Sequence, residues 1–447
     1  MPQEKDVSGL LGDLIAKARR AGADQADAVL LEGVSLSHAQ RLGRTEKLER
    51  SEGYDLGLRV LIGKRQAIVS SNDRAPERLG ELIERAVAMA KAVPEDPYCG
   101  LAEPDEIARH WPELDMVDPA EPSPESLIAH AGAAEDAARA VPGVTNSEGA
   151  EASWGRSRVQ MAASNGFAGG YIGTGHSVSV AVLAGEGSGM ERDYSYTSAV
   201  HAGDLRDAAA VGREAGERAV QRLGARKVAT CQVPVVFDPR IASSLLGHLL
   251  GAISGPAVAR GTSFLKDKLG QRLFPRGIAV IDDPHKPRGL RSKPFDGEGL
   301  ANTRRAIVED GVLTSWLLDL ASARQLHLKS TGHAARGTSS PPSPSPTNLW
   351  LEPGPVTAQE LLGDIAQGFY VTELMGMGVN GVTGDYSRGA AGFWIEGGEL
   401  AYPVSEVTVA GNLKDMFQRL SAASDLEFKT GIDAPTLRID GMTIAGT

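Results

Sequence analysis

The sequence predicts an α+β protein, with mixed sheets and covering helices in the N-terminal region and a β-rich domain at the C-terminal end. Runs of alternating apolar and polar residues recur along the chain and are typical of strands. Other runs place apolar residues three and four positions apart, which predicts amphipathic helices. There are 53 glycines but only 5% aromatic residues, which favours many tight turns. A chain of 447 residues has room for two or three domains.

We place the first domain at residues 1–100. Leu10, Leu11, Leu14, Ile15 and Ala18 form one apolar stripe and predict an opening helix. Residues 26–40 alternate like a strand, and residues 54–73 read as two strands around a turn at Gly63-Lys64. Residues 75–93 repeat apolar residues at helical spacing after an early proline, so a second helix follows.

The second predicted domain covers residues 101–226, and it repeats the same theme. Residues 123–141 predict a helix. Residues 157–186 predict a pair of strands joined at Ser164–Gly166, because Asn and Gly tolerate the positive φ of a tight hairpin turn. A helix over residues 204–222 closes the domain.

The third predicted domain covers residues 227–447. A short buried strand at residues 232–239 precedes an apolar helix, and hairpins are expected at Asp310-Gly311 and Gly397-Gly398. The segment 338–347 is rich in Ser and Pro, so we expect an irregular loop, with a mobile loop and a loop that lines a cleft as the two alternatives.

The composition excludes several classes of protein. The net charge is -11 and no basic run stands out, which argues against a nucleic-acid groove. The two cysteines are far apart and in no metal-like spacing, which suits a reducing compartment. No apolar run is long enough to span a membrane, and the N-terminus lacks the pattern of a signal peptide. We therefore expect a cytoplasmic protein.

The apolar helix at residues 243–264, SSLLGHLLGAISGPAVARGTSF, raises the question of a metal site because it contains His248. A zinc site takes about three protein ligands, and two of them commonly lie one turn apart on a helix beside a general-base Glu. This stretch contains no other His, Cys, Asp or Glu. We therefore interpret it as a packing helix in which Gly251 and Gly255 allow close approach of another backbone.

Four segments of the C-terminal region together resemble the TldD/PmbA family of metallopeptidases, also called modulators of DNA gyrase. They are the helix at residues 243–264, FDGEGLANTRRAIVEDGVL (residues 295–313), MGMGVNGVTGDYSRGA (residues 375–390) and APTLRIDGMTIAG (residues 434–446). GLRVLIGKRQAIVSSND (residues 57–73) extends the resemblance to the N-terminal region. In that family the TldD-type subunit carries His-Glu-x-x-x-His and a later Cys.

Counting back from the RGTS at residues 260–263, the resemblance places the two histidine positions on Leu246 and Gly251 and the Glu position on Gly247. No cysteine follows Cys231. The resemblance therefore implies no metal ligand and no catalytic residue in this chain, and the PmbA/TldE type of subunit. Zinc is expected in a TldD-type partner, and the substrate of such a pair is an unfolded peptide.

Candidate peptide-binding residues come from three places: His248, the Asp385-Tyr386-Ser387-Arg388 stretch of the Gly-rich block, and His333 with Arg336 before the Ser/Pro loop. Exposed backbone at a Gly-rich edge can pair with an extended peptide as an added strand. Turn and packing roles are the alternative for these residues. The acidic segment with Asp282, Asp283, His285, Asp296 and Glu298 is either a cation site or, as we favour, a solvated loop.

The expected function is that of a metallopeptidase-family subunit, itself non-catalytic, in a cytosolic TldD/TldE complex that degrades or processes unfolded peptides. A stand-alone homo-oligomeric protein that binds peptides without cutting them is the alternative. An independent hydrolase is a third possibility, but no G-x-S-x-G motif supports it. A phosphate-binding loop is not expected either, because the Gly-rich block lacks the Lys-Ser/Thr of a Walker loop.

Overall fold

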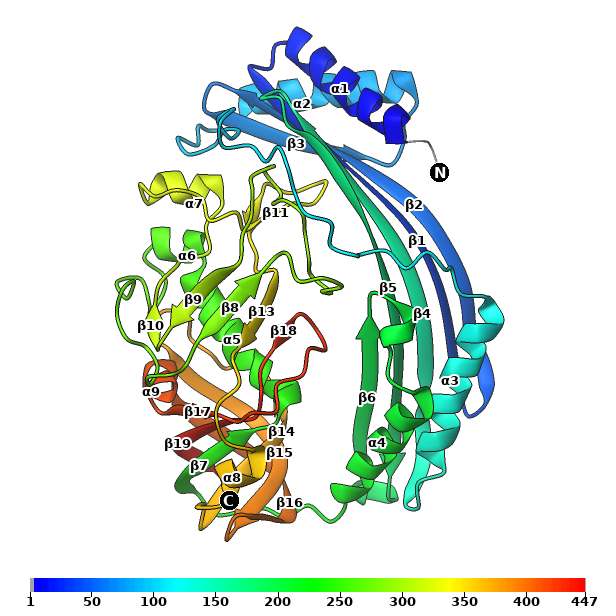
Figure 1. Ribbon diagram of the computed structural model, residues 1–447, viewed down its shortest axis with the longest axis vertical. Helices are drawn as coiled ribbons and strands as arrows, with labels where there is room; N and C mark the ends of the chain where they lie inside the picture. Colours follow the sequence, from blue (N-terminus) through cyan, green and yellow to red (C-terminus); the bar gives the residue numbers. More distant parts are fainter. Residues whose placement is uncertain (1–3, 447) are drawn as a thin grey trace.

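A computed structural model describes residues 4–446, with side chains from residue 8 onward. The α+β prediction is confirmed. Figure 1 shows a long curved sheet that arches over a C-terminal part containing shorter strands and helices. No helix in the described range is long and apolar enough to cross a membrane.

The long sheet has six strands in the order β3-β2-β1-β4-β5-β6, and every pair in it is antiparallel. The parallel pairs of the predicted mixed sheets occur instead in the C-terminal part. The predicted turns at Gly63-Lys64 and Ser164–Gly166 lie between paired strands as expected. The strands are β1 (Gln25–Arg41), β2 (Arg44–Ile62), β3 (Arg65–Ser71), β4 (Val144–Ala163), β5 (Ala168–Ala184) and β6 (Glu191–Ala199).

Two pairs of helices cover the two ends of this sheet. The helices α1 (Glu4–Arg20) and α2 (Pro76–Ala92) bury their apolar stripes on one end, and α3 (Pro124–Arg139) and α4 (Ala208–Gln221) bury theirs on the other. A Cβ at Gly212 of α4 would lie 2.1 Å from a backbone oxygen of α3, so glycine lets these two helices approach closely. Because β1 pairs with β4, residues 1–100 and 101–226 share one sheet.

The C-terminal part contains a closed barrel, and the predicted β-rich character is confirmed. Its strands run in the order β16-β15-β14-β7-β19, and β16 also pairs with β19, which closes the ring. The predicted hairpins at Asp310-Gly311 and Gly397-Gly398 are present. The strands are β7 (Cys231–Phe237), β14 (Gln367–Met375), β15 (Asp385–Glu396), β16 (Glu399–Asn412) and β19 (Leu437–Ala445), with the short β17 (Leu420–Ala422) beside β19.

A second sheet, ordered β10-β9-β8-β13-β18, stands beside the barrel, and helix α5 (Pro239–Ile253) packs in the core they share. Its strands are β8 (Val280–Asp283), β9 (Arg305–Glu309), β10 (Val312–Leu313), β13 (Asn348–Leu351) and β18 (Ile432–Asp433). The remaining elements are α6 (Gly255–Ala259), α7 (Leu320–Gln325), α8 (Ala358–Leu362), α9 (Leu413–Gln418), β11 (Ala334–Ala335), β12 (Ser343–Pro344) and short 3-10 turns at Gly187–Gly189 and Ala202–Asp204.

Gly57 of β2 marks where the long sheet meets the C-terminal part. A Cβ at this position would lie 2.3 Å from the carbonyl oxygen of Thr338, and the Thr338 hydroxyl donates to the carboxylate of Asp55. We expect Gly57→Val to lower the free energy of unfolding in urea by about 1–3 kcal/mol, because overpacking displaces backbone. Gly53→Val on the same strand is the control, since nothing lies within 4 Å of its Cβ position. Equal unfolding midpoints for the two variants would contradict this account of the contact.

Candidate functional site

Helix α5 forms because its ends and its apolar face are both specified locally. Asp238 caps it by accepting from the backbone N–H of Arg240 at 2.9 Å, and Pro239 occupies the first turn, where a missing N–H costs nothing. Four leucines and Ile253 bury one side of the helix in the barrel core: Leu245, Leu246, Leu249 and Leu250. The opposite side carries Ser244, Gly247, His248 and Gly251, which are exposed or half-buried.

The three positions that the resemblance assigned to a metal motif do not share one face of α5. Gly247 and Gly251 are exposed, and no atom lies within 4 Å of where a Cβ would stand on either. Leu246 is only 3% exposed and points into the core. Five residues along a helix rotate a side chain by about 140°, so Leu246 and Gly251 diverge. Leu246 therefore fills the core, while the open side of α5 carries Gly247 and Gly251.

The residues around α5 do not fit a zinc ion. His248 is the one metal-ligating side chain of the helix, and zinc needs several such donors. Among the side chains described, from residue 8 to residue 446, no three of His, Cys, Asp or Glu come together in a way that could hold a metal ion. No chemical step through a metal is therefore assigned to this chain.

Three of the predicted peptide-binding residues meet beside α5. The rings of His248 and Tyr386 pack edge to face with 5.7 Å between centroids, and Arg388 follows Tyr386 on the same face of β15. His248 Nε2, the Tyr386 hydroxyl and Arg388 Nε are buried without a hydrogen-bond partner in the described structure. Arg388 Nη2 donates to the carbonyl of Leu374 at 3.3 Å. Buried polar atoms without partners are costly, so this cluster suits a ligand that would complete it.

The protonation states in this cluster follow from burial. Burial, together with the positive charge of Arg388, holds the pKa of His248 below its usual value, so the imidazole is neutral near pH 7. Burial also raises the pKa of Tyr386 to about 12, which keeps the phenol protonated. Two neutral polar groups and one cation therefore face this region, which makes it a donor-rich environment.

Asp385 and Ser387 lie on the other face of β15, because successive side chains of a strand point to opposite sides. Asp385 accepts from the Thr383 hydroxyl at 2.6 Å and from Asn412 Nδ2 at 3.0 Å, so it belongs to a polar turn. These hydrogen bonds lower its pKa. The structure therefore separates these two candidates from His248, Tyr386 and Arg388.

The side chains of His333 and Arg336 are buried, and their polar partners lie outside the α5 cluster. His333 is 3% exposed, with Nε2 3.3 Å from a carboxylate oxygen of Asp282 and Nδ1 2.8 Å from the Thr331 hydroxyl. The Arg336 side chain is 1% exposed and forms an ion pair with Asp27 of β1. The Arg336 contact joins the C-terminal part to the long sheet, whereas the His333 contacts stay within the C-terminal part, and neither side chain is open to a peptide.

The acidic segment between residues 282 and 298 is not a solvated loop. Asp282 and Asp296 are 0% and 2% exposed, and Glu298 is 9% exposed. Asp296 accepts backbone N–H groups of Glu298 and Leu300 at 2.9 Å each, and Glu298 accepts from that of Leu320 at 2.8 Å. Burial raises the pKa of Asp296 to about 6, and burial with the nearby Asp296 raises that of Glu298 to about 8. These buried carboxyl groups therefore accept hydrogen bonds from backbone N–H groups in the protein interior.

Glu298→Gln should remove a pH dependence of stability. A free glutamate titrates near about pH 4.3, whereas folded Glu298 keeps its proton up to the pKa of about 8. Between these values the folded state binds a proton that the unfolded state has released, so the free energy of unfolding falls as pH rises. The variant should therefore gain stability relative to the parent from about pH 5 to about pH 8. Urea unfolding of parent and variant at about pH 5 and about pH 8 measures this gain in stability. Glu309→Gln is the control, because Glu309 is exposed.

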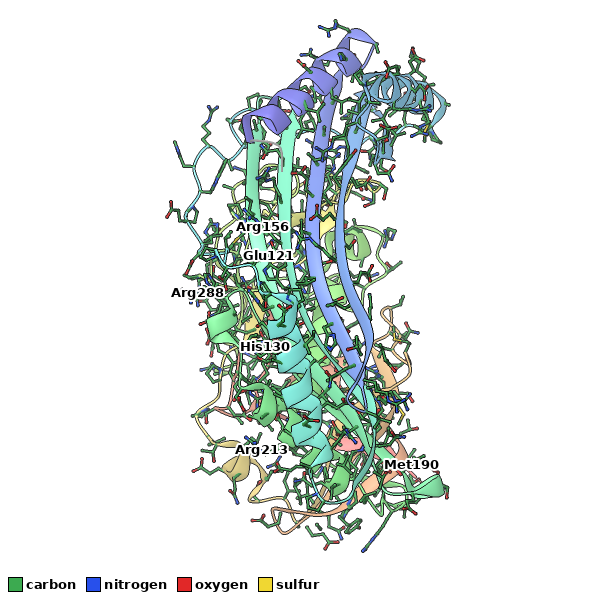
Figure 2. The ribbon with its side chains drawn as sticks, turned by 90° about the vertical axis from the view of Figure 1, so that its right-hand side faces the viewer. Glu121, His130, Arg156, Met190, Arg213 and Arg288 are labelled. Atoms are coloured by element: carbon green, nitrogen blue, oxygen red, sulfur yellow. The ribbon has the colours of Figure 1, made fainter. Side chains whose placement is uncertain are left out.

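A cavity of about 920 Å³ lies between the inner face of the long sheet and the segment at residues 289–293. Two neighbouring rows of small residues cross four strands and form its floor: Gly53, Gly33, Ser157 and Gly173, then Ser51, Ser35, Gly155 and Gly175. Larger side chains at these positions would fill the space. Figure 2 views the opposite, outer face, with Arg156 of β4 two residues after the buried Trp154 on the same strand.

A smaller pocket of about 380 Å³ lies over α5 at Gly247 and includes Arg388. Arg291 lines both this pocket and the large cavity, so the two spaces adjoin at its side chain. Neither Arg291 nor the small-residue floor was singled out from the sequence. The only signal for Arg291 in the sequence is that it is one of four spaced basic residues between residues 286 and 293, and the register of four strands was needed to see the floor.

Comparison with known proteins identifies the family. Family models match three stretches: PmbA/TldA metallopeptidase domain 1 at residues 26–90, the central domain at 117–223 and the C-terminal domain at 230–446. The metalloprotease PmbA of Escherichia coli O157:H7 is 39% identical over 427 residues, covering 95% of this chain and 93% of that protein. The chain belongs to the PmbA/TldD metallopeptidase family. A PmbA homologue of Haemophilus influenzae is 34% identical, with 99% and 97% coverage.

Solved structures agree with this PmbA/TldD membership. A protein from Bacteroides thetaiotaomicron, named as a modulator of DNA gyrase, superimposes with a TM-score of 0.91 at 27% identity, with 100% of both chains covered. TldE from Thermococcus kodakarensis superimposes with a TM-score of 0.88, covering 98% of this chain and 100% of that one. At 22% sequence identity, this superposition establishes a shared fold. The fold described above is therefore that of the PmbA/TldD family along its whole length.

Proposed function

We propose that this chain is the PmbA/TldE-type, non-catalytic subunit of a cytosolic two-subunit metalloprotease that degrades or processes unfolded peptides. The observation that carries the proposal is helix α5, which presents Gly247 and Gly251 where the resemblance expects metal-motif side chains. None of the nine histidines in the sequence is directly followed by glutamate, so no His-Glu-x-x-x-His motif occurs elsewhere. A TldD-type partner would supply the zinc, the general base and the activated water.

In this proposal the chain contributes space and contacts for the peptide. The cavity of about 920 Å³ falls within the range of ligand pockets, about 300–1,000 Å³, and its floor has almost no side chains. An extended peptide could lie over such a floor without displacing protein. His248, Tyr386 and Arg388 would provide polar contacts at α5 beside it.

A mixed-subunit assay tests the proposal. We expect the pure chain to hold no stoichiometric zinc and to cut no unfolded peptide, and a TldD-type subunit with zinc to become active or more active when the chain is added. Metal analysis and co-purification accompany the cleavage measurement. One tightly held zinc per chain with peptidase activity would overturn the proposal. A homodimer that binds peptide and never associates with the partner would support the stand-alone peptide-binding alternative instead.

A further inference from the structure

The pocket over α5 has an unusual balance of charge. Its lining contains three arginines, Arg240, Arg291 and Arg388, and no Asp or Glu. The chain as a whole carries a net charge of -11, so this pocket is opposite in sign to the rest of the molecule. The other lining groups include the hydroxyl of Ser243, a hydrogen-bond donor, whereas the hydroxyls of Ser244 and Thr430 already donate to the carbonyls of Ile241 and Ile432.

Two of the three arginines have no carboxylate partner. Arg240 is neutralised, because Nη1 lies 2.7 Å from Asp193 and Nε lies 3.3 Å from Asp238. Arg388 has only its bond to the Leu374 carbonyl, and its Nε is buried without a partner in the described structure. The Arg291 side chain has no hydrogen bond or ion pair within residues 4–446. Two guanidinium groups therefore face one small space without a counter-charge.

A further pocket shares Arg240 and Thr430 with the pocket over α5, and two of its acids, Asp433 and Asp238, already have partners. Asp433 accepts the backbone N–H groups of Lys429, Thr430 and Gly431 at 2.9–3.0 Å. Asp238 accepts from Arg240 and from the Tyr370 hydroxyl at 3.1 Å. Like charges in one pocket repel each other, and a bound anion would relieve this repulsion. Guanidinium groups match carboxylates especially well, because their planar N–H forks form paired bonds with both oxygens.

We propose that this pocket binds the C-terminal carboxylate of a peptide, held by Arg291 and Arg388. Arg291 lines both the pocket and the large cavity, so a peptide lying over the Gly/Ser floor would reach the pocket with one end. The site would thus orient the chain end within the space proposed above for unfolded peptides. This inference rests on the proposed handling of peptides, and it adds which end of the peptide is recognised.

The test measures binding to the purified full chain, without any partner. The probes are one fluorescein-labelled hexapeptide of Gly, Ala and Ser with a free C-terminal carboxylate, and the same peptide with a C-terminal amide. Fluorescence anisotropy should show the free acid binding at least about tenfold more tightly, the effect of a charge-assisted hydrogen bond. A third peptide, amidated and ending in Asp, separates the chain end from a side-chain carboxylate and should bind more weakly than the free acid.

Variants identify the residues. Arg388→Gln and Arg291→Gln should each reduce the preference for the free acid by at least about tenfold, and Arg388→Lys should retain part of it. Arg78→Gln on α2 is the matched control, because Arg78 is exposed and pairs only with surface acids. If Arg388→Gln fails to fold, Arg291→Gln still tests the site, since the Arg291 side chain has no partner to lose among the described side chains of residues 8–446.

Equal affinity for the acid and amide peptides would overturn the inference, as would unchanged preference in both arginine variants. It would also be overturned if Arg388→Gln kept the preference but lost association with a TldD-type subunit, because the pocket would then bind the partner. Failure of the proposed function is a separate result. In that case adding the chain leaves cleavage by the partner unchanged, while the acid-to-amide ratio of the chain alone is still measurable.

Discussion

Asp27→Ala is expected to lower the free energy of unfolding by about 3–5 kcal/mol, the usual cost of removing one partner from a buried ion pair. Asp27 of β1 is 4% exposed and lies between two buried arginines. Arg59 Nε of β2 is 2.9 Å from Asp27 Oδ2, and Arg336 of the C-terminal part pairs with Asp27 Oδ1. The variant would leave two buried guanidinium groups without the carboxylate that pairs with both of them.

The lowered pKa of Asp27 also indicates that its carboxylate stabilises the folded protein. Burial alone raises this pKa, but Arg336 and Arg59 outweigh burial and hold the pKa below its usual value. A carboxyl whose folded pKa is lowered stabilises the protein above its unfolded pKa and loses that contribution as pH falls through the folded value. The difference in stability between parent and variant should therefore be largest near neutral pH and shrink in acid.

Urea unfolding monitored by circular dichroism measures this effect. Glu49→Ala is the control, because Glu49 forms an ion pair with Lys47 in which both side chains are more than half exposed. Such exposed pairs contribute little, so the control should unfold like the parent. If Asp27→Ala also unfolded like the parent, the Asp27–Arg59–Arg336 cluster would not stabilise the contact between the C-terminal part and the long sheet.

Sequence patterns predicted the fold well wherever one face of an element is buried. In α2, Leu79, Leu82 and Ile83 repeat at helical spacing and all lie in the core. Strand β2 shows the limit of this reasoning. Its first half, residues 44–53, is exposed on both faces, so no alternation of apolar residues marks it, and only the part from Tyr54 onward was predicted as strand. Pairing with β1 extends the strand where hydrophobicity gives no signal.

The candidate site was only partly predictable, because its contacts join residues far apart in the sequence. His248, Tyr386 and Arg388 were each candidates, and the packing of α5 against β15 brings them together. Arg336 was also a candidate, yet its partner Asp27 lies 309 residues earlier, so its burial could not be read from its neighbours. An unpaired charge and a buried ion pair look identical in sequence, and only the three-dimensional partners distinguish them.

In the proposed complex with a TldD-type partner, Gly247→Phe is expected to abolish most of the peptide cleavage. Gly247 lines the pocket over α5, and no atom lies within 4 Å of its Cβ position, so a phenyl group fits without disturbing the fold but occupies the pocket. The helix itself should be slightly stabilised, since glycine is a poor helix former. Peptide affinity and mixed-subunit cleavage should each fall by at least about tenfold, which corresponds to about 1.4 kcal/mol of lost binding.

Gly12→Phe on α1 provides the matched comparison for this variant. Gly12 is also an exposed helical glycine with no atom within 4 Å of its Cβ position, and α1 lies at the far end of the long sheet from the barrel. Both variants should melt at or above the parent temperature, but only Gly247→Phe should lose cleavage. Because the two substitutions have the same effect on helix propensity and added apolar surface, any difference between them reports occupation of the α5 pocket. Full cleavage with Gly247→Phe would mean that the peptide does not pass over α5.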